Sequence, residues 1–412
     1  MNIFLINHYA GSPKMGMEYR PYYLAQEWVK MGHQVSILLA SHSHLRQHNH
    51  QMNEELEEEM IDGIQYIWIN TPDYKGNGLG RIKNMFAFIN KSWIRAGYFA
   101  KTYKPDIVIA SSTYPSDNYV AKKIAKLSGA KYVYEVHDLW PLSPMELGDM
   151  SKYHPFIVAM QHGENLAYRK ADAVVSMLPA TQEHMKEHGL DLKKWHYIPN
   201  GIVVDDWENT TQLPTSHQEL FEKLQKNNQT IIAYTGGHAL SNALSSLVET
   251  ARILQENTSI SFVLIGDGIE KEKIKDSAKE LSNIYFLDSI EKAAIPNALK
   301  MCDILFIGWN KNPLYRFGIS PNKIFDYMMA EKPIVHAVNA PNNFVDEAKC
   351  GIAVEAENSH AIAEAIIKLQ SLDKEERDMM GQNGKKYVLR NHDYKVLSKQ
   401  FISIFDSIKN KR

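Results

Sequence analysis

Four segments of the chain contain glycine together with charged or histidine residues directly after an apolar run: residues 7–20, 137–150, 236–242 and 308–322. In open α/β sheets, ligands bind outside the carboxyl ends of the strands, so loops at such positions are where chemistry should be sought. Two of the segments come from each half of the chain. We therefore expect a single cleft between two domains, lined by all four segments.

The segment around Lys323 has residues suited to binding a phosphate. Ser320 is a good N-cap and Pro321 suits the first position of a helix, which predicts a helix that begins here with unpaired backbone N–H groups. Lys323 lies in the first turn and adds positive charge, and Asp326 shares its helix face. An anion beside Lys323 and hydroxyl groups beside Asp326 describe the diphosphate and ribose of a nucleotide. A capped helix with an ion pair between these two side chains explains the same residues equally well.

Glycines and a histidine mark the other strand ends. Gly236 and Gly237 would let backbone N–H groups approach a phosphate closely, and Gly11 similarly allows a ligand near the backbone. The loop at Gly11 lacks the Lys-Ser/Thr ending of a P-loop, which disfavours ATP hydrolysis. His137 precedes Asp138 at its strand end, and this pair could hold sugar hydroxyls or take a proton from an attacking alcohol. A histidine satisfied by local backbone is the alternative.

Short apolar runs alternate with amphipathic stretches along the whole chain, the pattern of mostly parallel sheets with helices on both faces. A polar segment, 199–229, separates two halves and is interpreted as a linker. The pattern in each half therefore predicts one doubly wound α/β domain. The predicted strands are residues 2–6, 35–39, 64–69, 106–110, 132–136 and 173–177, then 230–234, 260–265, 284–287, 303–307 and 333–338.

Length and charge agree with this division. A single hydrophobic core stops growing at roughly 250–300 residues, so a chain of 412 residues with 44% hydrophobic residues should form two cores. Its 46 Lys and Arg against 48 Asp and Glu give a net charge of −2, which removes the electrostatic reason to expect nucleic acid as a partner. Two cysteines, with neither a signal peptide nor an apolar run of about 18 residues, predict a cytoplasmic location.

The segment 42–59 is rich in possible metal ligands. Its histidines and glutamates are His42, His44, His48, His50, Glu54, Glu55, Glu57, Glu58 and Glu59. They lack regular ligand spacing, however, and a long polar stretch between two strands is typical of a mobile loop. We therefore favour a loop over a metal site.

The segment 81–105 contains no acidic residue and carries several cations among large apolar side chains. The cations are Arg81, Lys83, Lys91, Arg95, Lys101 and Lys104. A basic aromatic helix of this kind can lie on an anionic membrane surface. A helix whose aromatic side chains pack on the sheet fits the pattern somewhat better, so peripheral membrane contact is the second interpretation.

Six strings of residues occur in an order and spacing that resembles the retaining glycosyltransferases of family 4, and within them the bacterial surface-polysaccharide and amino-sugar transferases. The resemblance covers nearly the whole chain. The strings are Asn7-His8-Tyr9 through Gly16-Met17-Glu18-Tyr19-Arg20, Tyr74-Lys75-Gly76-Asn77-Gly78 with Arg81, Asp138-Leu139-Trp140-Pro141, Ile198-Pro199-Asn200-Gly201, Tyr234-Thr235-Gly236, and Gly318-Ile319-Ser320-Pro321-Asn322-Lys323-Ile324-Phe325-Asp326-Tyr327.

The resemblance implies the GT-B fold, two doubly wound Rossmann-like parallel-sheet domains that face a central cleft. Residues 1–198 would form the acceptor-side domain, residues 199–390 the nucleotide-sugar-binding domain, and residues 391–412 a helix that packs back on the first domain. It also implies a hexosyl- or N-acetylhexosaminyltransferase. The sugar would pass from a UDP- or GDP-type donor to a glycan or polyprenyl-diphosphate-linked acceptor in bacterial surface polysaccharide synthesis, with retention at the anomeric carbon.

For the site, the resemblance implies that the departing phosphate helps to deprotonate the acceptor, without a metal and with no cofactor besides the nucleotide-sugar co-substrate. His137 would lie near the donor sugar, so we expect His137 and Asp138 to act in catalysis. The expected donor-binding residues are Gly11, Gly236, Gly237, Arg316, Gly318, Ser320, Asn322, Lys323 and Asp326.

The chain departs from the family pattern at two places. The family carries two glutamates at positions that Gly318 and Asp326 occupy here. The usual Arg and Lys that grip the diphosphate after the Gly236 turn also lack counterparts, because His238, Asn242 and Ala243 fill that stretch. Lys323 is then the main candidate cation, with Arg316 as a possible replacement for the missing ones.

Other functions fit parts of the sequence. Gly266-Asp267-Gly268 follows a predicted strand and Asp288 ends the next one, as in an NAD-dependent oxidoreductase, but Lys271 stands where the third glycine of the fingerprint belongs. A sugar-nucleotide epimerase could use the same fold. A carbohydrate-binding scaffold without activity is suggested only by the missing acid at Gly318.

Overall fold

The computed structural model describes residues 1–16, 19–76 and 78–410, and the chain forms two compact units. Unit 1 comprises Met1–Asn200 and Tyr394–Arg412, and unit 2 comprises Gly201–Asp393. The limits expected from the sequence, 198 and 390, precede the observed ones by two and three residues. Met17, Glu18 and Asn77 of the family strings, and residues 411–412 of the expected last helix, lie outside the described residues.

Unit 1 is built on an eight-stranded sheet with the order β3-β4-β2-β1-β5-β6-β7-β8. All neighbouring strands are parallel except β3 and β4. The central strands are apolar throughout and buried, as expected for a parallel sheet covered on both faces. The strands are β1 (Asn2–Ile6), β2 (Gln34–Ala40), β3 (Leu56–Ile61), β4 (Ile64–Ile69), β5 (Ile107–Ala110), β6 (Lys131–Val136), β7 (Ala173–Ser176) and β8 (Trp195–Tyr197).

The prediction of a mobile loop over 42–59 is wrong at its end, where β3 begins. β3 pairs antiparallel with β4, so that Glu57 lies opposite Trp68 and Glu59 opposite Tyr66. Three successive glutamates in its centre hid the strand from a search for apolar runs. Charged side chains on an edge strand discourage pairing with another sheet, which explains their presence here.

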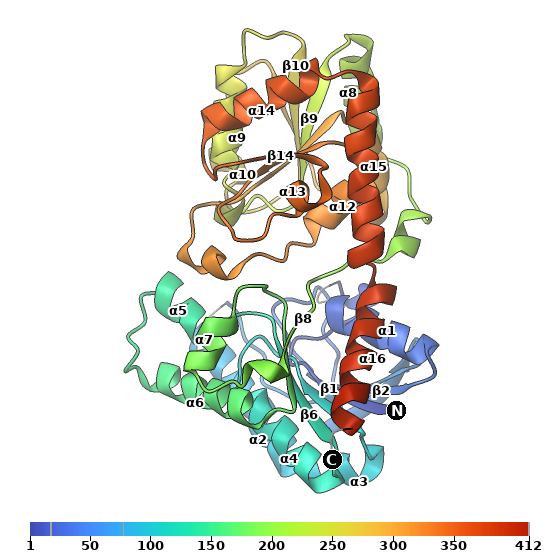
Figure 1. The fold of residues 1–412 in the computed structure, drawn as a ribbon, viewed down its shortest axis with the longest axis vertical. Helices are drawn as coiled ribbons and strands as arrows, with labels where there is room; N and C mark the ends of the chain where they lie inside the picture. Colours follow the sequence, from blue (N-terminus) through green and yellow to red (C-terminus); the bar gives the residue numbers. More distant parts are fainter. Residues whose placement is uncertain (17–18, 77, 411–412) are drawn as a thin grey trace. The chain divides into compact units, whose positions relative to one another are not determined.

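The helices of unit 1 form two groups that cover the sheet (Figure 1). Two groups are expected because the chain makes right-handed crossovers from the centre of the sheet toward both of its edges. In one group α16 packs on α1, where the indole of Trp28 donates to the Ser398 carbonyl oxygen at 3.3 Å and lies 5.6 Å from the Phe401 ring. In the other, α4 contacts α2, α3 and α6. The helices are α1 (Tyr19–Lys30), α2 (Leu79–Ile94), α3 (Ala96–Tyr103), α4 (Asp117–Ser128), α5 (Leu142–Leu147), α6 (Pro155–Lys170), α7 (Gln182–Glu187) and α16 (Tyr394–Asn410), with short 3-10 helices η1 (Pro13–Met15) and η2 (Leu192–Lys194).

Unit 2 has a six-stranded, fully parallel sheet with the order β11-β10-β9-β12-β13-β14. Its strands are β9 (Thr230–Thr235), β10 (Ile260–Ile265), β11 (Ile284–Leu287), β12 (Ile304–Gly308), β13 (Ile334–Ala337) and β14 (Gly351–Val354). Its helices are α8 (Thr215–Lys226), α9 (Leu244–Ile253), α10 (Lys271–Ser277), α11 (Ile295–Lys300), α12 (Lys323–Met329), α13 (Phe344–Ala348), α14 (Ser359–Ser371) and α15 (Lys374–Asn391), with the 3-10 helices η3 (Val204–Trp207), η4 (Leu240–Asn242), η5 (Lys292–Ala294) and η6 (Pro313–Phe317).

Alternate residues of the unit 2 strands enter two separate cores, one on each face of the sheet. Ile231 belongs to the core formed with α8, α11, α12, α13 and α15, whereas Ile232 belongs to the core formed with α9, α10 and α14. The interpretation of 199–229 as a linker is wrong for its second half, because α8 buries Phe221 and Leu224 in the first of these cores. Among the described residues, none of the helices combines the length and the apolar character needed to span a membrane.

Candidate functional site

The helix that carries Lys323 begins two residues later than expected. α12 starts at Lys323 itself, and the residue before it, Asn322, makes no side-chain cap hydrogen bond. Ser320 and Pro321, predicted as N-cap and first helical residue, instead lie in a non-helical segment before the helix. A distant residue holds this segment: the Asn342 side-chain amide accepts from the Ile319 N–H and donates to the Ile319 carbonyl oxygen, both at 2.9 Å.

α12 is attached to the carboxyl end of β9 by a buried tyrosine. The Tyr327 hydroxyl accepts from the Thr235 backbone N–H at 2.8 Å. One turn earlier on the helix, the Lys323 ammonium group donates to the Tyr234 hydroxyl at 2.6 Å and lies 4.0 Å from the centre of that ring. The helix and the strand end therefore hold Lys323 beside the turn that follows β9.

Gly236 and Gly237 form that turn, and the structure brings both of them together with Lys323. Gly236 has φ = 132°, and a Cβ atom on it would lie 2.7 Å from Cε and 2.9 Å from Nζ of Lys323. Glycine is thus needed both for the backbone conformation and for the approach of the lysine. The Tyr234 hydroxyl donates to the Gly237 carbonyl oxygen at 2.7 Å, which fixes the turn.

The turn holds two polar side chains in surroundings that disfavour their charged forms. Burial lowers the pKa of Lys323 to about 7. His238 is fully buried, and among the described residues neither of its ring nitrogens has a hydrogen-bond partner. Burial, followed by the charge of Lys271, lowers the pKa of His238 to about 4. A bound anion would stabilise the charged lysine and give these donors a partner.

The other donor-binding residues expected on this segment are placed differently. The Asp326 carboxylate accepts from the Trp207 indole at 3.3 Å, and it forms no ion pair with Lys323. Burial raises the pKa of Asp326 to about 6. The expected ion pair along the helix is therefore absent between these two described residues, and Asp326 lies under η3 instead of beside the lysine.

Arg316 and Gly318 belong to the end of η6. The Arg316 side chain is exposed, donates to the Pro313 carbonyl oxygen at 2.7 Å and lies 4.4 Å from the centre of the Phe317 ring. Gly318 ends η6 with φ = 102°, a conformation that favours glycine. The turn geometry thus gives Gly318 a structural reason, independent of any missing glutamate.

The glycines that suggested a dinucleotide site have a packing role. A Cβ atom on Gly266 would lie 1.9 Å from the Gly236 carbonyl oxygen, so the two turns lie directly against each other. Lys271, in place of the third fingerprint glycine, begins α10, and its ammonium group lies 2.9 Å from the Asp288 carboxylate. The acid that would hold a ribose in an oxidoreductase is therefore paired, which disfavours that function.

In unit 1 the strand ends surround a buried charge pair. Arg20 donates through Nε to Glu135 at 3.0 Å and through its other nitrogens to the carbonyl oxygens of Pro199 and Ile198. The Glu135 carboxylate also accepts from the Ser111 hydroxyl. Burial by itself would raise the Glu135 pKa, but Arg20, then His137 and Ser111, outweigh it and lower this pKa to about 2.

His137 is held by this pair, not by its neighbour in sequence. Its Nε2 lies 3.0 Å from Ser111 Oγ and 3.2 Å from Glu135 Oε2. Asp138 is exposed and forms no hydrogen bond through its carboxylate with the described residues. The expected pairing of His137 with Asp138 is therefore replaced by a pairing with Glu135, and the Asp138 carboxylate remains available to a ligand.

The loop after β1 places Gly11 differently from a phosphate-binding glycine. Its carbonyl oxygen accepts from the Tyr66 hydroxyl at 2.9 Å. Nearby, the fully buried His8 ring bonds to the Tyr114 hydroxyl through Nδ1 at 2.6 Å. The end of β1 is thus joined to the segment after β5 by a polar contact, with Tyr114 on its outer side facing a cavity.

This cavity, of about 630 Å³, lies among α2, α4 and α6 and has a mainly apolar lining that includes Tyr114, Met85 and Phe156. A second cavity of about 380 Å³ shares Phe86, Ile89 and Tyr119 with it and extends to Trp93. Together they form an apolar groove on unit 1. Phe86 and Trp93 are 56% and 41% exposed, so the sequence-based expectation that all aromatic residues of this segment pack on the sheet holds only in part.

Two cations lie against aromatic rings next to the groove lining. The Arg81 guanidinium lies over the Tyr9 ring, 5.4 Å from its centre, and donates to the Tyr9 hydroxyl; Tyr9 packs with Met85 and Tyr114 of the lining. The Lys123 ammonium group lies 4.3 Å from the centre of the Trp93 ring, which lines the second cavity, and donates to the Trp93 carbonyl oxygen. An elongated apolar ligand with an anionic group would find both an apolar surface and a nearby cation here.

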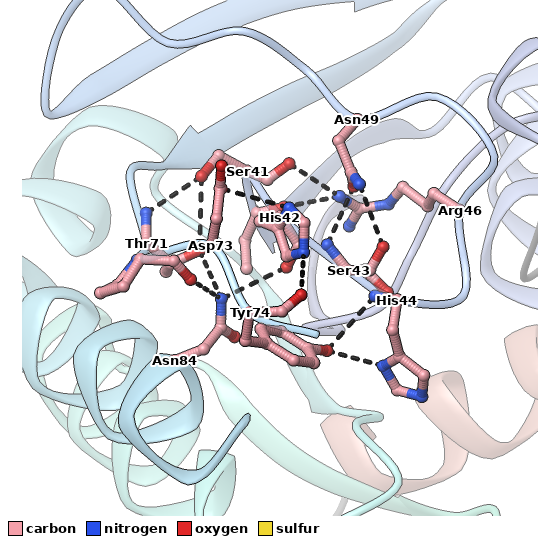
Figure 2. A network of polar contacts seen from close by, with 12 residues as sticks. Ser41, His42, Ser43, His44, Arg46, Asn49, Thr71, Asp73, Tyr74 and Asn84 are labelled. Atoms are coloured by element: carbon pink, nitrogen blue, oxygen red, sulfur yellow. Dashed lines mark hydrogen bonds and ion pairs between the residues drawn. The ribbon is translucent and has the colours of Figure 1, made fainter. Parts of the chain in front are cut away.

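Two histidines of the segment 42–59, His42 and His44, take part in a polar network shown in Figure 2. His42 lies 3.2 Å from the Asp73 carboxylate, and His44 Nδ1 lies 2.6 Å from the Tyr74 hydroxyl. Arg46 is buried and donates to backbone carbonyl oxygens, among them that of Ala10 at 2.7 Å. The network ties the loops after β1 and β2 together.

Two family models match the chain in succession. The model described as "Glycosyl transferase 4-like domain" matches residues 15–201, and the model described as "Glycosyl transferases group 1" matches residues 216–387. The chain belongs to the family 4 glycosyltransferases with the GT-B fold. The Gly236 turn and Lys323 lie in the second of these domains, and Glu135 and His137 lie in the first.

Curated relatives and solved structures agree with this family. An uncharacterized glycosyltransferase of Methanocaldococcus jannaschii is 23% identical over 60% of this chain and 61% of its own length. Alpha-D-kanosaminyltransferase of Streptomyces kanamyceticus is 22% identical over 60% of this chain and 63% of its own. The match thus spans about three fifths of the length of these curated relatives.

Solved glycosyltransferase structures superpose over almost the entire chain. HepE of Anabaena, in complex with UDP and glucose, has a TM-score of 0.65 at 17% identity and covers 99% of this chain and 100% of its own. Sucrose-phosphate synthase of Thermosynechococcus elongatus has a TM-score of 0.71 at 13% identity and covers 98% of both chains. At these identities the similarity shows the fold, and it confirms the expected GT-B architecture.

Several residues that organise this family 4 site were missed in the sequence. Tyr234 and Tyr327 position Lys323, and Asn342 holds the backbone before its helix. Glu135 and Ser111 hold His137. Most of these contacts join residues far apart in the chain. Glu135, by contrast, lies two residues before His137, and as an acid inside an apolar strand it gave a signal that could have been read.

We expect Glu135→Gln to destabilise unit 1 by roughly 3–5 kcal/mol at neutral pH, because the buried Arg20 would lose its counter-charge. The Glu135 pKa is about 2, below its ordinary value of 4.5, so its contribution is present above about pH 5 and is lost as pH falls toward 2. Urea unfolding at a series of pH values measures this. The difference between wild type and variant should shrink in that range, while the exposed Glu54→Gln control follows wild type. A difference that does not depend on pH would contradict the assignment.

Proposed function

We propose that this chain is a retaining glycosyltransferase of hexosyl or N-acetylhexosaminyl type, which moves a sugar from a UDP- or GDP-type donor to a polyprenyl-diphosphate-linked acceptor or glycan in bacterial surface polysaccharide synthesis. The observation that carries the proposal is the Lys323 ammonium group, buried beside the Gly236 turn at the carboxyl end of β9. HepE, a structural neighbour, was solved with UDP and glucose, which supports a nucleotide-sugar as the donor.

Lys323 is suited to hold the diphosphate of the donor. Burial lowers its pKa to about 7, so the surroundings of the free protein disfavour the charged form. A diphosphate within reach would favour the charged form, so binding takes up a proton and places the cation on the leaving group. We assign the nearby N–H group of Gly237 and the His238 ring to the same diphosphate, and Asp326 to the ribose. The Gly236 N–H donates to the Ile265 carbonyl oxygen at 2.9 Å, so Gly236 contributes space for the lysine and no donor.

The transfer step follows from this assignment. The acceptor hydroxyl oxygen forms a bond to the anomeric carbon while the bond from that carbon to the phosphate oxygen breaks, on the same face of the sugar. The hydroxyl proton passes to the departing phosphate oxygen, and Lys323 stabilises the negative charge of the nucleoside diphosphate. His137 and Asp138 contact hydroxyl groups of the sugar and the acceptor, and no metal is required.

The groove on unit 1 supports a lipid-linked acceptor. Its adjoining cavities offer an apolar path from Tyr114 to Trp93, which suits an isoprenoid chain. Arg81, beside Tyr9, suits the diphosphate that follows such a chain. We also propose peripheral contact with the inner face of the cell membrane through 81–105. Lys91, however, lies 2.8 Å from Glu55, so it contributes less than its charge suggests.

Lys323→Met tests the nucleotide site. We expect it to weaken binding of UDP or GDP roughly 100-fold, because a charged hydrogen bond to the diphosphate is lost. The folded-state pKa of about 7 lies below the ordinary 10.5, so this lysine costs stability below about pH 7 and the cost fades toward pH 10.5. The free variant should therefore melt higher than wild type at neutral pH. Calorimetry and thermal melting measure both effects, with the exposed Lys368→Met as control; unchanged affinity would remove Lys323 from the site.

A donor screen tests the reaction itself. We expect release of UDP or GDP from one nucleotide-sugar in the presence of a polyprenyl-diphosphate-linked saccharide, and a product with the anomeric configuration of the donor, seen by NMR. The rate should not change when EDTA is present. An inverted product would overturn retention, a dependence on added divalent ions would overturn the metal-free step, and reduction of NAD in place of transfer would overturn the proposal.

Ile89→Asp tests the groove, since this residue lines both cavities. Placing a charge there should raise KM for a long-chain acceptor at least about tenfold, the loss expected for one buried apolar side chain. UDP affinity and the rate with a short water-soluble acceptor should stay unchanged. Leu127→Asp, at an exposed position of α4, is the control. If the variant instead loses only its sedimentation with phosphatidylglycerol vesicles, the groove contacts the bilayer and not the acceptor.

A further inference from the structure

Three potential metal ligands meet between α6 and α7 of unit 1, away from the residues assigned to donor and acceptor. They are Glu164 on α6, His184 on α7 and His188, which follows α7. One ligand atom of each lies within 4.8 Å of those of the other two. Across the described ranges, 1–16, 19–76 and 78–410, this is the single group of three such side chains that meets this distance.

The spacing of the two histidines suits a common ligand. His184 and His188 are four residues apart, so consecutive turns present both rings on one side of the helix, and the ring centres are 4.6 Å apart. Glu164 approaches from α6, with its Oε1 3.5 Å from His184 Nε2. The carboxylate is almost fully buried, whereas both rings are partly exposed, which leaves a path for an ion.

Neighbouring side chains hold these ligands in place. The buried Tyr168 hydroxyl donates to Glu164 Oε1 at 2.8 Å, and Gln161 donates to Oε2 at 2.7 Å. His188 Nδ1 lies 3.1 Å from the Asn165 amide oxygen. Metal ligands in proteins are usually oriented by hydrogen bonds of this kind, which fix the carboxylate and the ring before the ion arrives.

We propose that Glu164, His184 and His188 bind a Zn²⁺-class divalent transition-metal ion that joins α6 to α7. Two imidazoles and one carboxylate suit zinc, whereas magnesium and calcium prefer oxygen ligands alone. Ligand atoms around a tetrahedral zinc are about 3.3 Å apart, so small rotations of the two partly exposed rings would close the group, with water as the fourth ligand. The ion takes no part in sugar transfer.

The test uses the full chain after treatment with a chelator. Calorimetry should show one high-affinity site for Zn²⁺, and Co²⁺ should give the visible absorption bands of a four- or five-coordinate site. His184→Gln and His188→Gln should each weaken Zn²⁺ binding more than about 100-fold, beyond the loss typical for a residue that only orients a ligand. His162→Gln, at an exposed histidine of the same α6, is the matched control and should bind like wild type.

Two further readouts separate this site from the rest of the chain's 17 histidines and from the proposed activity. Saturating Zn²⁺ should raise the melting temperature of wild type and of the control, but not of the double variant H184Q/H188Q. UDP affinity should be the same with and without the ion. If the double variant binds Zn²⁺ as tightly as wild type, or if wild type shows no site tighter than the double variant, the proposal is wrong.

Discussion

The contacts between α12 and the carboxyl end of β9 surround a lysine ammonium group that forms no ion pair with a carboxylate of the described residues. Tyr234 accepts its hydrogen bond, the absence of a side chain at Gly236 makes room for it, and Tyr327 fixes the helix that carries it. Each of these contacts holds a charge in a place where burial disfavours it. Such an arrangement costs stability in the protein without a ligand, and under the proposed function the diphosphate of the donor would offset this cost.

In unit 1, by contrast, the buried charges form an ion pair. Arg20 and Glu135 neutralise each other, and the remaining donors of Arg20 are satisfied by backbone carbonyl groups at the end of β8. The pair therefore fixes structure and presents the His137 ring from a rigid support. Lys323 of unit 2 is thus not neutralised by a carboxylate of the described residues, whereas the Arg20–Glu135 pair of unit 1 is neutralised and positions the His137 ring.

The sequence predicted the fold well because parallel strands are long apolar runs that local pattern reveals. Each of the eleven predicted strands is present, with ends that differ by at most one residue. Three strands were not predicted because they are not long apolar runs. β3 is largely acidic, and β8 and β14 are short strands at the edges of their sheets. For the site, Lys323 and the Gly236 turn followed from residue type and position. The start of α12 and the partner of His137 did not, because Asn342 and Ser111 act from distant parts of the chain.

Unit 1 is discontinuous: it needs α16, whose Phe401 packs on Trp28, yet α16 is separated from the rest of that unit by the whole of unit 2. The chain enters unit 2 near Ile202 and leaves it near His392. These two segments lie side by side, and the Ile202 N–H donates to the His392 carbonyl oxygen at 2.8 Å. On the ribosome, the first 200 residues therefore emerge without the helix that covers part of their apolar surface. Unit 2 is continuous and can complete its core before α16 is synthesised, whereas unit 1 cannot complete its core until α16 is present.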